Sequence, residues 1–261
     1  MVSSPATPKM LPALRQAPFT LGTGPLGVLC IHGFTGTPAD LRDLALQLVD
    51  AGHTVTNVRL AGHADSEVAL AATRWPDWWH SVLSAYLELR NRCARVVVVG
   101  FSMGGLLALK LAAHYPLDGA AILAAPLFLR KLSWHLVPVL SHVVRYRPRT
   151  PVSIREPLAH ARQSNPGRTP MVCLASFREL MANVNTLVPS VRCPLLLVYS
   201  AADGTVPFDN QAYLAGRVHS LSVQTVSLHD SDHVVTLDGE HATVEAAVVT
   251  FVNQRAMGGE S

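Results

Sequence analysis

The chain holds one serine in the pattern Gly-x-Ser-x-Gly, at Gly100-Phe-Ser-Met-Gly104. Four consecutive valines precede the pattern and a segment rich in Ala and Leu follows it, so we expect a buried strand, a sharp turn and a helix. Ser102 would stand at the apex of that turn with its hydroxyl exposed. A serine in this position can act as a nucleophile if a base and oxyanion donors lie beside it. A purely structural serine would need neither.

The residues that would activate this serine should follow later strands, with an acid first and the base last. Asp203 follows an apolar strand, at the carboxyl end where open α/β sheets build their sites. Its competitor Asp209 begins the next helix, where a carboxylate acts mainly on the helix dipole. His233 lies just beyond the last predicted strand. It is preferred because His229 is still near the end of that strand and His241 is within the final helix.

A second loop, His32-Gly-Phe-Thr-Gly36, ends a predicted strand and is expected to lie beside the nucleophile turn. The backbone N–H groups of Phe34 and Met103 would then point at a developing oxyanion, and one such fixed donor contributes about 10²–10³-fold to turnover. The side chains of both residues would line the acyl pocket. His32 itself is expected to hydrogen-bond the loop and to do no chemistry.

The elements that must position these residues alternate between strand and helix, which favours right-handed crossovers and a mostly parallel sheet. We expect strands near residues 27–31, 54–58, 95–100, 119–125, 193–199 and 221–228. We expect helices near residues 38–51, 74–91, 103–114, 208–216 and 239–254. Residues 19–21 are expected to add an antiparallel edge strand.

The connection between the strands near 119–125 and 193–199 far exceeds the two to six residues typical of α/β units, so we expect an inserted cap, or lid. Its apolar first part, residues 129–146, favours one or two short helices. Residues 147–170 favour a loop and residues 176–187 a helix. The expected divisions are an N-terminal extension (1–18), a core domain (19–126 and 191–261) and the cap (127–190).

Charge is distributed unevenly. The net charge is +3 at pH 7, yet between Leu127 and Arg178 nine Lys and Arg residues stand against one acid, Glu156. This segregation indicates a distinct module, whose basic residues either contact anionic lipid surfaces transiently or form a solvated face. The sequence lacks the motifs of RNA-binding modules and a DNA-reading helix, so no nucleic-acid partner is expected.

Neither a metal nor another cofactor is expected. The four cysteines form no C-x-x-C pair, and no H-E-x-x-H pattern occurs. Residues 1–18 lack the apolar core of a signal peptide, no stretch reaches 18 apolar residues, and the cysteines suit a reducing compartment. We therefore expect a cytoplasmic location, with a bacterial periplasm left open as the alternative. Asp230 and Asp232, close to the predicted base, either raise its basicity or cap the turn.

Six motifs occur in the order and spacing of one enzyme family. They are His32-Gly-Phe-Thr-Gly36, Gly62-His63, Asp77-Trp78-Trp79, Gly100-Phe-Ser-Met-Gly104, Asp203-x-x-Val206-Pro207 and His233-Val-Val-Thr-Leu-Asp238. From about residue 19 to 254 the chain resembles bacterial monoacylglycerol lipases and small Bacillus-type carboxylesterases. The resemblance implies an α/β-hydrolase fold with Ser102, Asp203 and His233 as catalytic triad. Ala64 departs from the family, which usually has glycine after Gly-His.

We therefore predict a serine esterase that hydrolyses short- to medium-chain monoesters, monoacylglycerols among them, through an acyl-enzyme. Thioesterase, perhydrolase and carbon–carbon hydrolase chemistry remain open on the same triad, as does a non-catalytic ligand-binding homologue. The first part of the cap is expected to roof an acyl tunnel. The residues concerned are Leu127, Phe128, Leu132, Trp134 and Leu136. The sequence does not indicate an oligomeric state.

Overall fold

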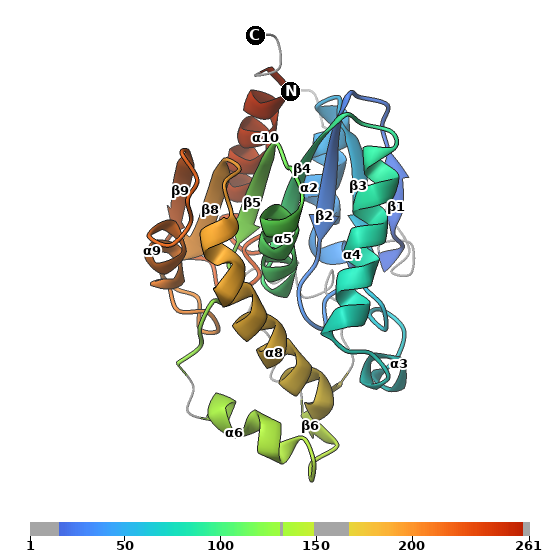
Figure 1. Ribbon diagram of the computed structural model, residues 1–261, viewed down its shortest axis with the longest axis vertical. Helices are drawn as coiled ribbons and strands as arrows, with labels where there is room; N and C mark the ends of the chain where they lie inside the picture. Colours follow the sequence, from blue (N-terminus) through green and yellow to red (C-terminus); the bar gives the residue numbers. More distant parts are fainter. Residues whose placement is uncertain (1–15, 131–132, 149–166, 258–261) are drawn as a thin grey trace, which may run out of the picture.

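The computed structural model describes residues 16–130, 133–148 and 167–257, and within these ranges seven strands form one mixed sheet (Figure 1). The strand order is β1-β3-β2-β4-β5-β8-β9, with β1 antiparallel to β3 and the other neighbours parallel. The bounds are β1 Phe19–Leu21, β2 Leu26–Ile31, β3 Thr54–Val58, β4 Arg95–Phe101, β5 Gly119–Leu123, β8 Leu195–Ser200 and β9 Val223–Leu228. The parallel sheet and its antiparallel edge strand agree with the expectation from the sequence.

Strand β4, the valine run before Ser102, lies at the centre of the sheet between β2 and β5. Val96 and Val98 belong to the hydrophobic cluster on one face, Val97 and Val99 to the cluster on the other, and all four are fully buried. A continuous β-branched run is stable here because helices cover both faces of a central parallel strand. The predicted two-sided burial of this strand is confirmed.

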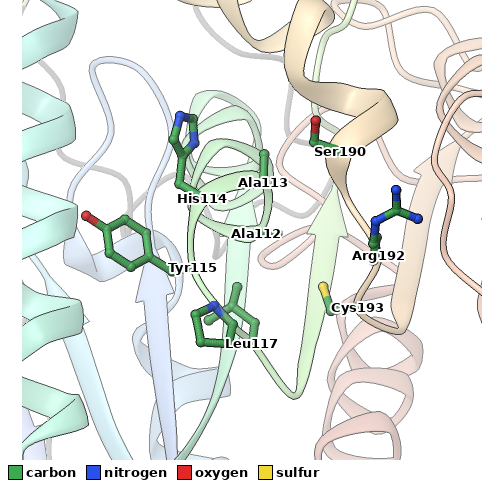
Figure 2. Close-up of a pocket in the computed structure, with 9 residues that line it drawn as sticks. Ala112, Ala113, His114, Tyr115, Leu117, Ser190, Arg192 and Cys193 are labelled. Carbon is green, nitrogen blue, oxygen red and sulfur yellow. The ribbon is translucent and has the colours of Figure 1, made fainter.

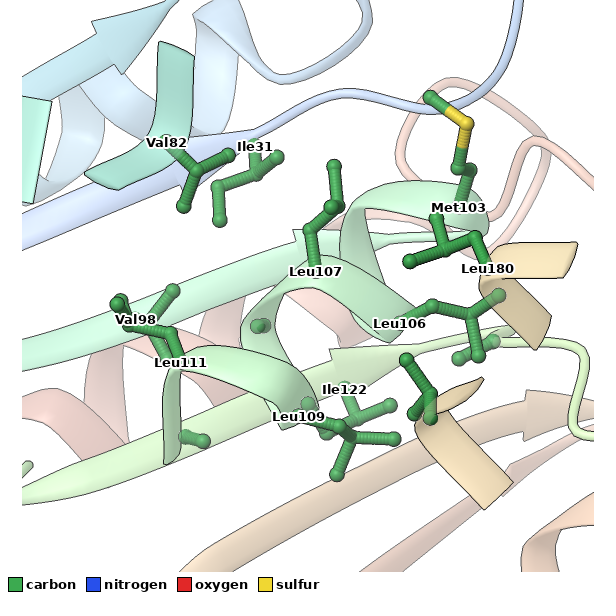
Figure 3. Packing of buried hydrophobic residues seen from close by; sticks show 14 of the residues in the cluster. Ile31, Val82, Val98, Met103, Leu106, Leu107, Leu109, Leu111, Ile122 and Leu180 are labelled. Atoms are coloured by element: carbon green, nitrogen blue, oxygen red, sulfur yellow. The ribbon is translucent and has the colours of Figure 1, made fainter. Parts of the chain in front are cut away.

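Helices α4, α5 and α8 pack on one face of the sheet, and α2 and α10 pack on the other. The bounds are η1 Pro38–Asp40, α2 Arg42–Asp50, α3 Glu67–Ala71, α4 Trp75–Arg90, α5 Met103–His114, α9 Asn210–Ala215 and α10 His241–Met257. Figure 3 shows the leucines of α5 packed against Val98 and Ile122 of the sheet, with Leu180 of α8 in the same cluster. No helix in the described ranges is both long and apolar enough to cross a membrane.

The segment between β5 and β8 contains α6, a two-stranded antiparallel pair and the long helix α8. The bounds are α6 Ser133–Leu140, β6 Tyr146–Pro148, β7 Arg168–Pro170, α8 Met171–Leu187 and η2 Val188–Ser190. In Figure 1, α6 and β6 lie below the carboxyl ends of the strands, and α8 runs from there back to the sheet.

Two expectations about this segment are wrong. The described ends of residues 147–170 form the paired strands β6 and β7 rather than loop. Thr169 precedes a proline, which favours extended backbone, and Arg168 of β7 packs over the Tyr146 ring of β6 at 4.9 Å. Helix α8 begins at Met171 rather than near 176. Its first turn is stabilised by tertiary packing, since Met171 is buried in a small cluster with residues of α6.

Candidate active site

Ser102 lies at the turn between β4 and α5 with φ 52° and ψ −118°. A positive φ is strained for serine, and close backbone packing around the turn holds it. A Cβ atom on Gly100 would lie 2.3 Å from the Gly104 carbonyl oxygen, and one on Gly104 would lie 2.1 Å from the Ile31 carbonyl oxygen. The turn therefore requires glycine at both positions, and it presents the serine at the carboxyl edge of the sheet.

The His233 imidazole lies between Ser102 and Asp203. Its Nε2 is 2.9 Å from Ser102 Oγ, and its Nδ1 is 2.8 Å from Asp203 Oδ2. A proton on Nδ1 faces the carboxylate in this arrangement, which leaves Nε2 free to accept the serine proton. The second oxygen of Asp203 accepts the N–H groups of Thr205 and Val206 at 2.7 and 2.9 Å. The carboxylate is thus held in one orientation.

The competing acid and bases lie elsewhere. Asp209 pairs with Arg130 at the surface. The His241 ring bonds to the Asp238 carbonyl at 2.8 Å, and His229 is exposed at the end of β9. The acid and base chosen from the sequence are therefore the ones in line with the serine, since His233 contacts Ser102 and Asp203 contacts His233.

The loop after β2 lies against this turn, as a Cβ on Gly33 would be 3.3 Å from the Cβ of Ser102. Among the described residues, neither the Phe34 N–H nor the Met103 N–H has a hydrogen-bond partner. Met103 is the first residue of α5, where N–H groups have no partner within the helix. Two free backbone donors therefore flank Ser102, in the loops expected to supply them.

His32 braces the same loop. Its Nε2 accepts the N–H of Leu60 at 3.2 Å, and its Nδ1 lies 2.9 Å from the Gly33 carbonyl. Complete burial lowers the pKa of His32 to about 3, with His63 and Arg59 acting in the same direction. A neutral ring that hydrogen-bonds the loop is the role expected from the sequence.

Aromatic side chains gather around Phe34. Phe177 of α8 stacks on it at 5.3 Å, Trp78 lies 5.6 Å away, and Trp134 of α6 meets the edge of Phe177 at 5.6 Å. Phe177 lies within the helix expected over residues 176–187, but it was not among the residues expected in the site. The signal available was its helical spacing from Cys173 and Leu180, which are buried on the same face.

The residues expected to roof an acyl tunnel are placed differently from one another. Leu127 is buried in the main core cluster and Phe128 is half-buried beside it. Leu136 is 56% exposed on the outer face of α6, whereas Val137 is buried, because successive residues of a helix are about 100° apart. Leu136 therefore does not roof an interior site. Leu132 lies outside the described residues.

A surface pocket of about 450 Å³ opens at the far end of α5 (Figure 2). It lies at the amino ends of β5 and β8, about 18 Å along the helix from Ser102. Burial raises the pKa of its Cys193 thiol to about 12, so this thiol is not a reactive nucleophile. No cluster of His, Cys, Asp and Glu able to hold a metal ion occurs in the part of the chain that the structure describes.

Comparisons with known proteins converge on one group of enzymes. Residues 26–240 match the family described as "Serine aminopeptidase, S33". The thermostable monoacylglycerol lipase of Bacillus sp. (strain H-257) is 32% identical over 247 residues, which cover 94% of this chain and 98% of that protein. The carboxylesterase of Bacillus subtilis (strain 168) is 29% identical, covering 91% and 96%. A solved structure from work on LipS and LipT, two metagenome-derived lipolytic enzymes, has a TM-score of 0.87 and 27% identity, covering 92% and 98%.

Proposed function

The chain belongs to the serine aminopeptidase S33 family of the α/β-hydrolase fold, and on that premise we propose that Ser102, His233 and Asp203 are its catalytic triad. The protein is a carboxylic-ester hydrolase, as are the curated relatives that it matches over almost its whole length. The observation that carries the triad is the pair of hydrogen bonds on the His233 ring, 2.9 Å to the serine oxygen and 2.8 Å to the carboxylate.

In the proposed reaction, His233 removes the proton of Ser102 as its oxygen attacks the ester carbonyl. Asp203 holds the imidazole tautomer and stabilises its positive charge. The N–H groups of Phe34 and Met103 stabilise the oxyanion of the tetrahedral intermediate. His233 then protonates the departing alcohol. Water repeats the cycle on the acyl-enzyme and releases the acid.

The proposed substrates are medium-chain monoesters, monoacylglycerols among them, bound beneath a cap formed by residues 127–190. The acyl chain would lie against Phe34, Trp134 and Phe177, whose rings contact one another near the free N–H of Phe34. Each buried methylene contributes about 0.8 kcal/mol, so four additional methylenes favour a medium-chain ester over acetate by about 3 kcal/mol. The name of the Bacillus sp. relative supports a monoacylglycerol substrate.

A chain-length series of p-nitrophenyl esters and monoacylglycerols, measured on wild type and Ser102→Ala, tests the function. We expect a medium-chain optimum that Ser102→Ala abolishes. A maximum at acetyl esters contradicts the acyl site. Faster turnover of thioesters or diketones in the same assay would favour the other chemistries that this triad supports.

The choice of acid is tested by a matched pair of variants. Asp203→Asn should lower kcat by about 10⁴-fold, because the amide no longer holds the imidazole tautomer. Asp209→Asn should leave kcat near wild type, since Asp209 pairs with Arg130 at the surface. The reverse outcome would show that Asp209 is the acid.

The outer face of α6 and the turn after it support transient contact with an anionic lipid surface. Leu136, Val139 and Val143 are 56%, 70% and 79% exposed, which is unusual for three apolar side chains so close together. Arg145 and Arg147 follow, and each basic residue near an anionic bilayer contributes about 1 kcal/mol.

Co-sedimentation with vesicles tests this contact. We expect wild type to bind phosphatidylserine vesicles better than phosphatidylcholine vesicles and to lose binding in high salt. The double variant Val139→Ser, Val143→Ser should bind less, whereas Val68→Ser, which changes an equally exposed valine of α3, should not. Absent or salt-insensitive binding contradicts the proposal and leaves a solvated basic face.

A cytoplasmic location is part of the proposal. The support for it is that all four cysteines are free, three of them buried. Disulfides are rare in that reducing compartment. Fractionation of the native cell with an antibody to this chain tests the location, and recovery outside the cytoplasm contradicts it.

A further inference from the structure

The proposed acid and base lie on two loops, and each of them lies several residues beyond the end of its strand. Strands β8 and β9 are in register as far as Ser200 and Leu228, and a final bond joins the Ala201 N–H to the Leu228 carbonyl. Asp203 and His233 both lie beyond that point. The strand pairing therefore does not fix the 2.8 Å contact between their side chains.

One carboxylate oxygen bridges these two loops through hydrogen bonds. Oδ1 of Asp232 accepts the N–H of Gly204 at 3.0 Å and the N–H of His233 at 2.7 Å. Because Gly204 directly follows Asp203, this oxygen joins the backbone beside the acid to the backbone of the base. Asp232 is only 9% exposed, and its own N–H donates to the fully buried Asp238 carboxylate at 2.7 Å. Hydrogen bonds to a carboxylate are stronger than those between neutral groups.

Other contacts do not replace this one. Ser200 Oγ donates to the Ser231 carbonyl, which braces the two loops at their bases but touches neither the residue after the acid nor the base itself. Asp232 is not a second acid either. Both ring nitrogens of His233 already face Ser102 and Asp203, and the Asp232 carboxylate accepts the backbone N–H groups of Gly204 and His233.

We propose that Asp232 is a positioning residue, which sets the distance between the Asp203 carboxylate and the His233 imidazole by joining their two loops through one shared oxygen. The proposal rests on the triad proposed above. It assigns to Asp232 a geometric role, in place of the raised basicity or simple turn cap that the sequence left open.

Three variants of the full-length protein test the role by kcat and KM. Asp232→Ala should lower kcat by about 10–10²-fold with KM nearly unchanged, since a displacement of about 1 Å in a catalytic group costs up to about 10²-fold. Asp232→Asn should keep kcat within about three-fold, because its amide oxygen accepts the same two N–H groups. Asp230→Ala removes an exposed acid of the same loop and should match wild type.

The His233 Nδ1 proton provides a second readout. Its downfield ¹H NMR resonance should persist in Asp232→Asn and shift or broaden in Asp232→Ala, whereas a role in stability alone would change only Tm. Wild-type kcat in Asp232→Ala, or an Asn variant as impaired as the Ala variant, overturns the proposal.

A replacement variant and the activity of the wild type distinguish the remaining outcomes. If Asp232→Ala does not fold, Asp232→Ser must show the same loss of kcat, because its hydroxyl is one atom too short to reach Gly204. A wild type that hydrolyses no ester contradicts the proposed function. An active wild type whose Asp232→Ala variant keeps its kcat contradicts only the positioning role.

Discussion

Four described residues other than glycine have a positive φ, and two of them belong to the proposed site. These two are Thr35, in the oxyanion loop at 57°, and Ser102 at 52°. Backbone strain of this kind persists where the surrounding structure imposes it, and it gathers at functional sites. Ala124, at 49°, follows β5 at the same edge of the sheet. Ala64, at 66°, has no role in the proposed chemistry, so its strain can be relieved without loss of activity.

Ala64→Gly should raise stability by about 0.5–1 kcal/mol, because the relief of a left-handed alanine exceeds the added freedom of glycine in the unfolded chain. For a protein of this size, Tm should rise by about 1–3 °C. Ala61→Gly is the matched control in the same loop. It has no positive φ and should lower Tm. Thermal unfolding measures both, and an Ala64→Gly variant no more stable than wild type would show that the loop carries no strain.

His32 gives stability a predictable dependence on pH. Its pKa is about 3 when folded and 6.5 as the unperturbed value, so below pH 6.5 the unfolded chain gains a proton that the folded protein does not. The contribution of His32 to the free energy of unfolding is therefore complete above pH 6.5. It declines by about 1.4 kcal/mol per pH unit as the pH falls toward 3. His32→Gln should remove this slope. Urea unfolding between pH 7 and 4 measures the difference, and parallel curves would contradict the assignment.

Among the elements, α9 holds the chain where it leaves β5. The fully buried amide of Asn210 accepts the N–H groups of Leu127 and Phe128 at 2.7 and 3.0 Å, and it donates to the carbonyls of Phe128 and Pro207. Asn185 of α8 donates to the Leu127 carbonyl at 2.7 Å. The backbone at the start of the cap is thus satisfied by side chains from two helices rather than by strand pairing.

Asn210→Ala should lower the free energy of unfolding by about 2–5 kcal/mol, because two buried N–H groups lose their acceptor. Asn91→Ala, at the exposed end of α4, is the control and should have little effect. Urea denaturation measures both variants. A loss under 1 kcal/mol in Asn210→Ala would mean that water replaces the amide.

For the whole molecule, periodicity predicted most of the fold, because most elements show their burial in their own sequence. Four valines in a row indicate the central strand without any knowledge of its neighbours. Helix α3 and strand β7 were not predicted from the sequence. They contact each other across about a hundred residues, where Glu67 pairs with Arg168 at 2.9 Å, so each is stabilised by a partner that local sequence does not reveal.

The same limit applies to the site. Ser102, Asp203 and His233 follow strand ends at spacings that a motif can capture. The packing of Phe177 on Phe34 depends on the path of α8, and the oxygen shared by Gly204 and His233 depends on how two loops approach. Neither contact has a local pattern, so only the folded chain reveals them.

The two hydrophobic clusters divide the proposed site by the faces of the sheet. Val234 and Val235, which follow the base, pack in the cluster of α2 and α10. Phe177, with Phe34 and Trp134 packed against it, belongs to the cluster of α4, α5 and α8. Substitutions in separate clusters share few neighbours, so their effects are nearly additive. A lineage with this fold can therefore vary the residues of the proposed acyl pocket around Phe177 while the packing behind the proposed base, His233, stays undisturbed.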